Sequence, residues 1–310
     1  MWISVHYASK VFLFLLFFFY GAKLAPRETL LGLKNWRLHA VIFCFTFILF
    51  PIIGVGLKYA TIGWLGQGLA LGLLYLTLVP GTVQSSIAFT SVAHGNVAGA
   101  IVASSLSNIL GVFLTPLLVM LTMATTGDVH ITGRSILDIF LQILLPFIIG
   151  QLLHKYLGPG LNRHPILTKT VDRGTIWINV YTAFSQAVVE GVWMRVTALH
   201  LLALVGICIA VVSLVLVLSW CMAKGLGFNR EDCIAAQFCG SKKSLSSGIA
   251  MGAVLFAGST GELSAGILML PLMLFHLFQL LICAVLAGRY GRQWEREHTH
   301  AHANDQGAAQ

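Results

Sequence analysis

The most informative shortage in this sequence is charge. Only 10% of the 310 residues are charged, whereas 57% are hydrophobic and the mean hydropathy is +0.85. Soluble domains carry about one quarter charged residues, so the composition excludes an ordinary water-soluble fold. The remaining charges fall in short clusters between apolar runs of about 20 residues, the length that crosses a hydrocarbon core. The composition therefore predicts an all-α, polytopic membrane helical bundle.

Paired cysteines and catalytic motifs are also missing. The six cysteines form no CxxC pair and no spacing typical of a metal site, so we interpret them as packing residues. The sequence has no HExxH, no GxSxG and no membrane-embedded pair of acidic residues, which argues against an intramembrane enzyme. The net charge of +8 is spread over loops and forms no continuous stripe, which excludes a nucleic-acid partner. Neither a cofactor nor a metal is predicted.

Apolar runs between the charged clusters predict nine membrane spans. The first run resembles a signal-peptide core, but its flanks make a poor cleavage site, so a retained helix is expected. A transmembrane domain over 1–297 is followed by a polar tail, 298–310, expected to be disordered; its alternating His298, His300 and His302 could bind a metal, but a solvated tail is the simpler interpretation. The nine ranges are 5–23, 38–58, 63–93, 96–124, 135–157, 172–192, 197–223, 231–257 and 264–288.

Basic residues are distributed unevenly between the two sides of the predicted bundle. Thirteen Lys and Arg fall in the loops of one side, and four fall on the other. The positive-inside rule makes the side with thirteen cytoplasmic. The pattern predicts a protein of the cell (inner) membrane, in contact with the lipid bilayer, with the C-terminus in the cytoplasm and the N-terminus outside.

Two of the predicted spans are interrupted by polar segments. The third contains LVPGTVQSSIAFTSVAHG, and the eighth contains FCGSKKSLSSGIAMG. Freed backbone groups survive at membrane depth only where they are buried in protein or line a watery cavity, and paired breaks in a transporter indicate a midplane binding site. The candidate site residues of the two breaks are Pro80, Gly81, Thr82, Gln84, Ser85, Ser86, Gly240, Ser241, Lys242, Lys243 and Ser244.

The adjacent Lys242 and Lys243 are the sharpest signal in these breaks. Each lysine near the bilayer centre costs roughly 2.5 to 3.5 kcal/mol on the insertion scale. We interpret the pair as a fixed positive charge that faces an anionic ligand. Alternatively, the two lysines lie in a loop between re-entrant segments or extend to the membrane interface.

The fourth and last spans add further polar candidates. Ser104, Ser105, Ser107 and Asn108 lie on the fourth span, where hydroxyls and an amide could bind an ion or solute or could hold helices together. In the last span, His276 stands three residues from Gln279 and could face the cavity or bond to a neighbouring helix.

The motifs PGTVQSS and FCGSKKSL resemble the bile acid:sodium symporter superfamily, specifically a branch of solute carriers that has both motifs, and the likeness extends from about Phe14 to Arg292. The resemblance implies two inverted five-helix repeats, a core and a panel subdomain interleaved along the chain, and two broken helices that cross at the binding centre. It also implies secondary active transport of an organic anion or similar solute by alternating access, with no covalent step and no cofactor. The nine predicted spans lack the opening helix of the ten that many members have; either this is a natural nine-span form or the start codon was assigned late.

The sequence departs from sodium-coupled members of that family at the second break. Where they carry a carboxylate and an amide, this chain has Phe238 and Lys242, and no Asp or Glu lies near either break. Two ammonium groups repel Na⁺, so we hypothesise that a lysine takes the place of the bound sodium or couples transport to protons. The coupling ion, Na⁺ or H⁺, is left open. A channel and a regulatory protein that binds a solute without moving it are the alternatives to a carrier.

Overall fold

The computed structural model describes residues 2–23, 35–124, 137, 140–163, 165–189, 196–257, 259 and 261–308. Within these ranges the chain is built from helices and turns, with no strand. This confirms the predicted all-α class. Helix occurs in each of the nine ranges predicted as spans.

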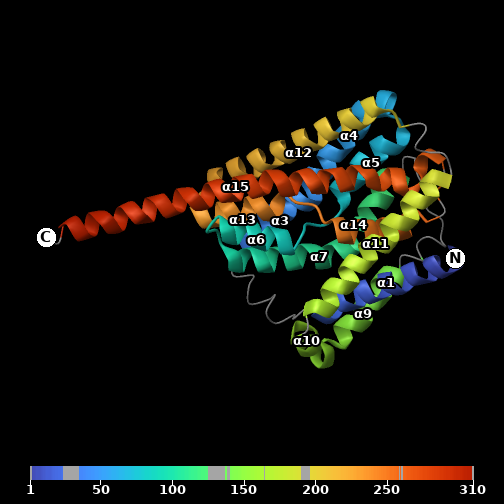
Figure 1. The fold of residues 1–310 in the computed structure, drawn as a ribbon, viewed down its shortest axis with the longest axis horizontal. Coiled ribbons are helices and arrows are strands. Elements are labelled where there is room, and N and C mark those ends of the chain that lie inside the picture. Colours follow the sequence, from blue (N-terminus) through green and yellow to red (C-terminus); the bar gives the residue numbers. More distant parts are fainter. Residues whose placement is uncertain are drawn as a thin grey trace.

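The helices follow one another with few long connections (Figure 1). By length and apolar composition, four helical stretches could cross a membrane, or up to five if a bent pair counts as one span. The prediction of nine spans therefore stays a prediction. The helices are α1 (Trp2–Lys23), α3 (Trp36–Cys44), η2 (Phe45–Leu49), α4 (Phe50–Leu65), α5 (Gln67–Leu78), α6 (Gln84–Val92), α7 (Val97–Val119), η3 (Met120–Ala124), η4 (Phe140–Leu144), α9 (Leu145–Leu152), α10 (His154–Arg163), α11 (Pro165–Val189), α12 (Ala198–Gly225), α13 (Arg230–Gly240), α14 (Leu245–Leu255), η6 (Gly261–Leu263) and α15 (Ala265–Ala308).

The two predicted breaks are present. Helix α5 ends at Leu78 and α6 begins at Gln84, while α13 ends at Gly240 and α14 begins at Leu245. Pro80 has no N–H and disfavours helical backbone at the preceding residue, which is extended at ψ 156°. Every residue from Gly68 to Leu78 is buried. The first half of the broken helix, α5, is therefore surrounded by protein, as freed backbone groups in a membrane require.

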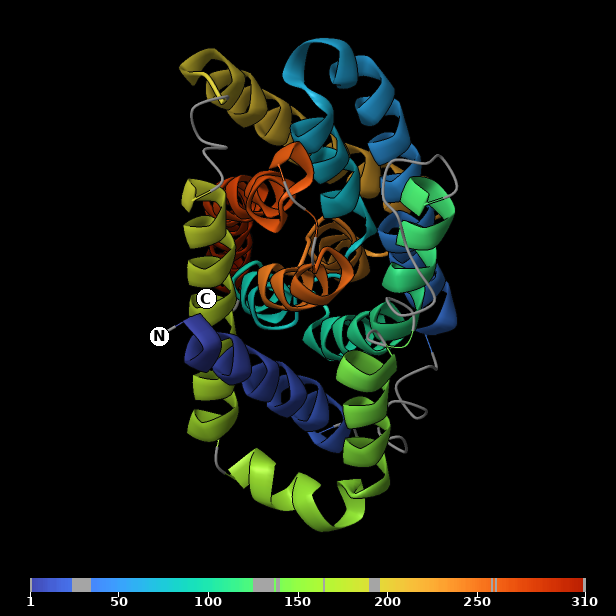
Figure 2. The same ribbon diagram turned by 90° about the vertical axis from the view of Figure 1, so that its right-hand side faces the viewer.

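The helices separate into two groups, visible in Figure 2. In the first group, α1, α9, α10 and α11 pack on one another. In the second, α3 to α7 and α12 to α15 pack together around α5 and α13. We call these the panel helices and the core helices. The groups meet mainly where α11 contacts α14 and α15.

The fifth predicted span, 135–157, differs from the structure at its end. Helix α9 stops at Leu152, and the chain turns by 92° into α10. The sequence of α10, HKYLGPGLNR, contains Pro159 and several polar residues. Burying the polar groups of such a helix in hydrocarbon would be costly. Helix α10 lies across the end of the other panel helices (Figure 2).

Helix covers part of the C-terminal tail, and the disorder expected for residues 298–310 stays a prediction. Helix α15 is continuous from Ala265 to Ala308, so residues 298–308 extend it beyond the packed helices (Figure 1). Extending an existing helix avoids the cost of nucleation, and the alanines of this segment are good helix formers.

The two breaks touch each other beneath α7. The Ser244 N–H donates to the Pro80 carbonyl at 2.8 Å. The Pro80 ring lies against Gly111 of α7, where an added Cβ would stand 2.5 Å from the proline Cβ and 2.7 Å from its Cγ. The missing side chain at Gly111 therefore lets α7 close over the first break.

We expect Gly111→Ala to destabilise the protein, because a rigid proline ring cannot move out of the way of the added methyl group. Overpacking of this kind costs about 1–3 kcal/mol, which should lower the melting temperature in detergent. Gly206→Ala is the matched control, since nothing lies within 4 Å of the added Cβ on α12. Equal melting temperatures for the two variants would contradict the packing described here.

Candidate functional site

The ammonium group of Lys243 is enclosed by backbone carbonyls. Its Nζ donates to the carbonyl oxygens of Thr46 at 2.9 Å, Thr77 at 2.7 Å and Val79 at 2.9 Å. The lysine is 0% exposed. Three acceptors at these distances require three N–H donors, so the geometry describes a charged ammonium group.

The sequence explains why these three carbonyls are free. Thr77 and Val79 lie at the C-terminal end of α5, where the last carbonyls of a helix have no donor within the helix. In the π-helix η2, the Phe50 N–H bonds to the carbonyl of Phe45, one residue before Thr46. The following residue, Pro51, has no N–H to offer. The first break and η2 thus leave carbonyl oxygens without backbone donors around one position, and the ammonium group of Lys243 occupies that position.

No carboxylate is needed to hold this charge. The C-terminal end of α5 carries the negative end of the helix dipole, and two of the three carbonyls belong to it. The Phe50 ring lies 4.2 Å from the Lys243 Nζ, measured to the ring centroid, and its electron-rich face attracts a cation.

The backbone of Lys243 is fixed by a side chain from α15. The Lys243 N–H donates to Gln279 Oε1 at 2.9 Å, and Gln279 Nε2 donates to the Lys243 carbonyl at 2.8 Å. The same amide nitrogen lies 2.7 Å from His276 Nδ1. An amide nitrogen only donates, so Nδ1 accepts and a neutral His276 carries its proton on Nε2.

Lys242 points to the other side of the break. Its Nζ donates to the Ser85 carbonyl at 2.8 Å, and it lies 3.9 Å and 5.3 Å from the ring centroids of Phe89 and Phe238. Like Lys243, it is 0% exposed. Phe238 therefore forms part of an aromatic wall around a lysine.

The polar residues of α7 and of the first break bond to one another. Gly81 donates its N–H to Ser107 Oγ at 3.2 Å and accepts from Asn108 Nδ2 at 2.8 Å. Asn108 Oδ1 in turn accepts from Ser247 Oγ at 2.9 Å. This chain of hydrogen bonds joins both breaks through α7.

The remaining candidates of the two breaks are held locally. The Thr82 hydroxyl lies 2.7 Å from that of Ser85 and 3.1 Å from that of Ser86. Ser104 contacts the Cys239 Sγ at 3.6 Å, and the Ser241 hydroxyl donates to the Gln237 carbonyl. At Gly240 an added Cβ would lie 3.3 Å from Phe45 Cβ.

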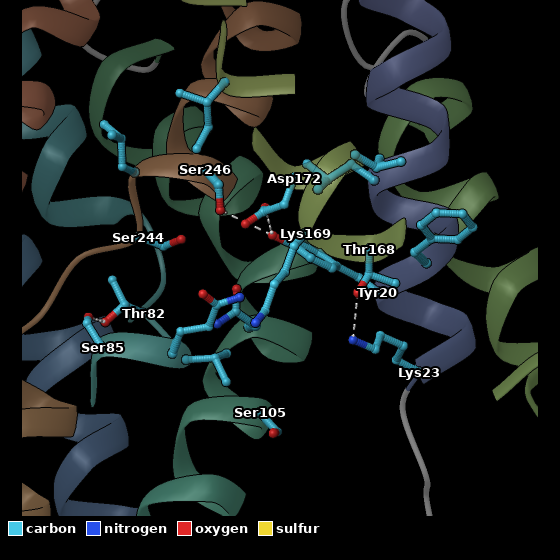
Figure 3. Close-up of a pocket in the computed structure, with 18 of the residues that line it drawn as sticks. Tyr20, Lys23, Thr82, Ser85, Ser105, Thr168, Lys169, Asp172, Ser244 and Ser246 are labelled. Atoms are coloured by element: carbon cyan, nitrogen blue, oxygen red, sulfur yellow. Dashed lines mark hydrogen bonds between the residues drawn. The ribbon is translucent and has the colours of Figure 1, made fainter. Parts of the chain in front are cut away.

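A cavity of about 640 Å³ lies between the panel helices and the core helices (Figure 3). Apolar side chains from α1, α7, α9 and α11 form much of its wall. Its polar lining comes from both breaks and the residues that follow them, from α1 and α11, and from α7 and α15. The polar and charged lining residues are Tyr20, Lys23, Thr82, Gln84, Ser85, Ser105, Asn108, Thr168, Lys169, Asp172, Ser244, Ser246 and His276.

The structure divides the predicted site residues into two sets. The residues that line the cavity are Thr82, Gln84, Ser85, Ser105, Asn108, Ser244 and His276. The others lie behind the wall: Pro80, Gly81, Ser86, Ser104, Ser107, Gly240, Ser241, Lys242 and Lys243. Both lysine ammonium groups therefore face protein groups and stand outside the lining of the cavity, because the carbonyls and rings beside them already surround the charge.

Sequence reasoning missed the charged residues of the panel helices. Lys23 lines the cavity from the end of α1, and its Nζ donates to Thr168 Oγ1 at 3.0 Å, while Lys169 and Asp172 line it from α11. The expectation that no acidic residue lies near either break is wrong, because folding brings Asp172 beside Ser246, two residues past the second break (Figure 3). The available signal was a carboxylate at the first residue of the predicted span 172–192.

We expect Gln279→Leu to destabilise the protein by leaving the N–H and carbonyl of Lys243 without partners. A buried orphan polar group costs about 1–3 kcal/mol. Gln293→Leu on the exposed part of the same helix is the control, since that glutamine bonds only to the exposed Glu297 in the described contacts. The melting temperatures of the two purified variants test this, and an unchanged value for Gln279→Leu would show that the break is held by other contacts.

Known proteins resemble the chain over nearly its whole length. The model of the SBF-like CPA transporter family matches residues 1–292. Uncharacterized protein PA2026 of Pseudomonas aeruginosa is 48% identical over 279 residues, which are 90% of this chain and 83% of that protein. "Putative symporter YfeH" of Escherichia coli is 45% identical over 285 residues, 91% of this chain and 83% of that protein.

A more distant relative comes from a vertebrate. Sodium/bile acid cotransporter 7 of Xenopus tropicalis is 28% identical over 273 residues, which are 87% of this chain and 78% of that protein. The resemblance read from the two break motifs is thereby confirmed. Because the family model and the relatives cover both breaks and the helices that enclose the cavity, this integral membrane protein belongs to the SBF-like CPA transporter family.

Proposed function

We propose that the protein is a secondary active transporter that moves an organic anion across the cell membrane by alternating access. The observation that carries this proposal is the cavity of about 640 Å³, whose walls come from the panel helices on one side and from both breaks on the other. A solute held between two groups of helices can change sides when one group moves against the other.

The order of the helices supports an inverted repeat. The broken helix α5–α6 is followed by α7, and the broken helix α13–α14 is followed by α15. The same order places α1 with α11 and α3–α4 with α12, which leaves α9 without a counterpart among the described helices. We propose nine spans with both breaks at the membrane centre, the C-terminus in the cytoplasm and the N-terminus outside.

The charges that line the cavity favour an anionic solute. Lys23 and Lys169 line it from the panel helices, and Asp172 is the one carboxylate among the described lining residues. The hydroxyl groups of Thr82 and Ser105 and the amide group of Asn108 can form hydrogen bonds with the same solute. The apolar wall between them suits a solute with a hydrocarbon body, and the volume lies within the range of ordinary ligand pockets.

The buried lysine takes the place of a bound sodium ion in this proposal. The Lys243 ammonium is held by three carbonyl oxygens and an aromatic face, which is a site that a small cation could also occupy. A tethered ammonium supplies the positive charge that keeps the crossing of the two breaks together. Sodium is then not required at that point.

We expect an organic anion that binds the cavity to raise the melting temperature of the purified protein. The screen should include steroid carboxylates and sulfates, sugar phosphates and short organic acids. The variants Lys23→Gln and Lys169→Gln should lose most of this stabilisation, because each removes a cation from the lining. Lys224→Gln, on the exposed end of α12, should retain it.

Counterflow in proteoliposomes then separates a carrier from the alternatives. A carrier preloaded with the stabilising anion should accumulate the labelled anion transiently with saturable kinetics. Non-saturable flux would indicate a channel, and tight binding without flux would indicate a solute-binding regulatory protein. Either result would refute the proposed transport function.

We expect Lys243→Ala to create a sodium site. Removing the ammonium leaves the carbonyls of Thr46, Thr77 and Val79 without their donor, and each orphan group costs about 1–3 kcal/mol. NaCl should therefore raise the melting temperature of this variant more than choline chloride does, since a ligand that binds only the folded state stabilises it.

Lys242→Ala is the matched control for this measurement. It removes a lysine of equal burial that contacts one carbonyl, that of Ser85, so no cage of oxygens remains. Sodium should have little specific effect on this variant or on the parent. A sodium effect of equal size in all three proteins would show that Lys243 does not stand in a cation site.

A further inference from the structure

The lysine that replaces sodium leaves the transporter without a coupling ion. An ammonium group that is covalently attached to the chain cannot be released with the solute, so it cannot transfer the energy of an ion gradient. If the proposed transport is driven, another group that can bind and release an ion must lie within reach of the cavity. The inference that follows rests on the proposed function.

The cavity lining contains one described carboxylate, that of Asp172 on α11. The Tyr20 hydroxyl, from α1, donates to Asp172 Oδ1 at 3.0 Å, and its oxygen lies 3.2 Å from Ser246 Oγ on α14 (Figure 3). Tyr20 and Asp172 belong to the panel helices, whereas Ser246 belongs to the core helices. The three side chains thus form a hydrogen-bonded link between the two groups, next to the second break.

The protonation state of Asp172 changes what this link can do. An ionised carboxylate accepts hydrogen bonds through both of its oxygens, but a protonated one has a donor in place of one acceptor. With the proton bound, the Tyr20 hydroxyl loses a charge-assisted acceptor, and such bonds are roughly twice as strong as neutral ones. Proton binding therefore weakens the connection between panel and core at this point.

We propose that Asp172 is the proton-binding site of the transporter and that a proton is carried together with the anionic solute. Lys23 on α1 and Lys169 and Arg173 on α11 are the charged groups near the carboxylate, and His276 lines the same cavity from α15. Burial of Asp172 favours the protonated carboxylate, and the neighbouring cations oppose this by stabilising the ionised form.

A bound anion shifts this balance. An anion held by Lys23 and Lys169 neutralises the cations that stabilise Asp172 and repels its negative charge. Protonation of Asp172 removes that repulsion, so anion and proton each increase the affinity for the other. Cooperative binding of this kind gives proton–anion symport. The same coupling means that the link between the panel and core helices is weakened in the carrier that holds both anion and proton.

A thiol reporter on the cavity wall tests this without knowledge of the solute. Val102 lines the cavity from α7 and has no part in the link, so Val102→Cys can report access. The background carries Cys44→Ser and Cys221→Ser, which remove the two exposed native thiols. Labelling by a membrane-impermeant maleimide is measured in right-side-out and inverted vesicles between about pH 5 and pH 8, because the pKa values of buried carboxyl groups in proteins extend into this range.

The same reporter with Asp172→Asn is measured at every pH and serves as the reference, because the maleimide reaction itself depends on thiol ionisation. We divide the labelling rate of the protein that has Asp172 by that of the Asp172→Asn variant. We expect this ratio to change about threefold or more as the pH falls, because protonation shifts the populations of the conformations that expose Val102→Cys. Asp172→Glu should retain the pH dependence. Tyr20→Phe and Ser246→Ala should reduce it, because they cut the link and leave the carboxylate in place.

The outcomes separate this inference from the proposed function. A ratio that is constant with pH, while the reporter is reached from both faces, would refute the role of Asp172 and leave alternating access intact. A reporter that is reached from only one face under all conditions would count against the proposed transport itself. Unchanged pH dependence in both Tyr20→Phe and Ser246→Ala would refute the link between protonation and the contact of panel and core.

Discussion

The interaction on which the rest of the structure depends is the contact between the Lys243 ammonium and three backbone carbonyls. Two helices break inside a membrane bundle, and each break leaves polar backbone groups that hydrocarbon cannot satisfy. The ammonium comes from the second break, and two of its acceptors belong to the end of α5 at the first. The side chain of Lys243, from the second break, therefore donates hydrogen bonds to carbonyl oxygens of the first. Gln279 in turn satisfies the backbone N–H and carbonyl of Lys243.

Two kinds of lysine follow from this arrangement, and they have different tasks. Lys242 and Lys243 are fully buried and hold the crossing together. Lys23 and Lys169 belong to the panel helices and line the cavity. A positive charge behind the wall still contributes to the electrostatic potential inside the cavity, because Coulomb interactions act beyond direct contact. The buried pair therefore adds to the argument for the proposed anionic solute, although its ammonium groups stand outside the lining of the cavity.

Much of the fold could be predicted from the sequence, because composition, apolar run length and the Pro80 and Gly240 breaks are local signals. The polar half of the site that comes from the breaks, including Gln84, Ser85 and Ser244, was found in the same way. Tyr20, Lys23 and Asp172 could not be found so, since each stands near a predicted span end, where charged and aromatic residues are common. Only the packing of α1 and α11 beside the second break brings them into the cavity. The direction of the Lys243 side chain could not be predicted either. It depends on the Thr46 carbonyl, which η2 leaves without a backbone donor and which lies 197 residues earlier in the chain.

The tethered cation also changes what the empty carrier can do. A carrier that binds sodium at its crossing must lose that ion on each cycle, and the carbonyls around it then stand without a partner until another ion arrives. In the proposed carrier the Lys243 ammonium occupies the cage throughout the cycle, so the three carbonyls keep a donor. Under the proposed function, the empty carrier would then return without carrying an ion at this point. Any dependence on an ion gradient must therefore act where the panel and core helices meet, and the cluster of Tyr20, Asp172 and Ser246 stands at that boundary.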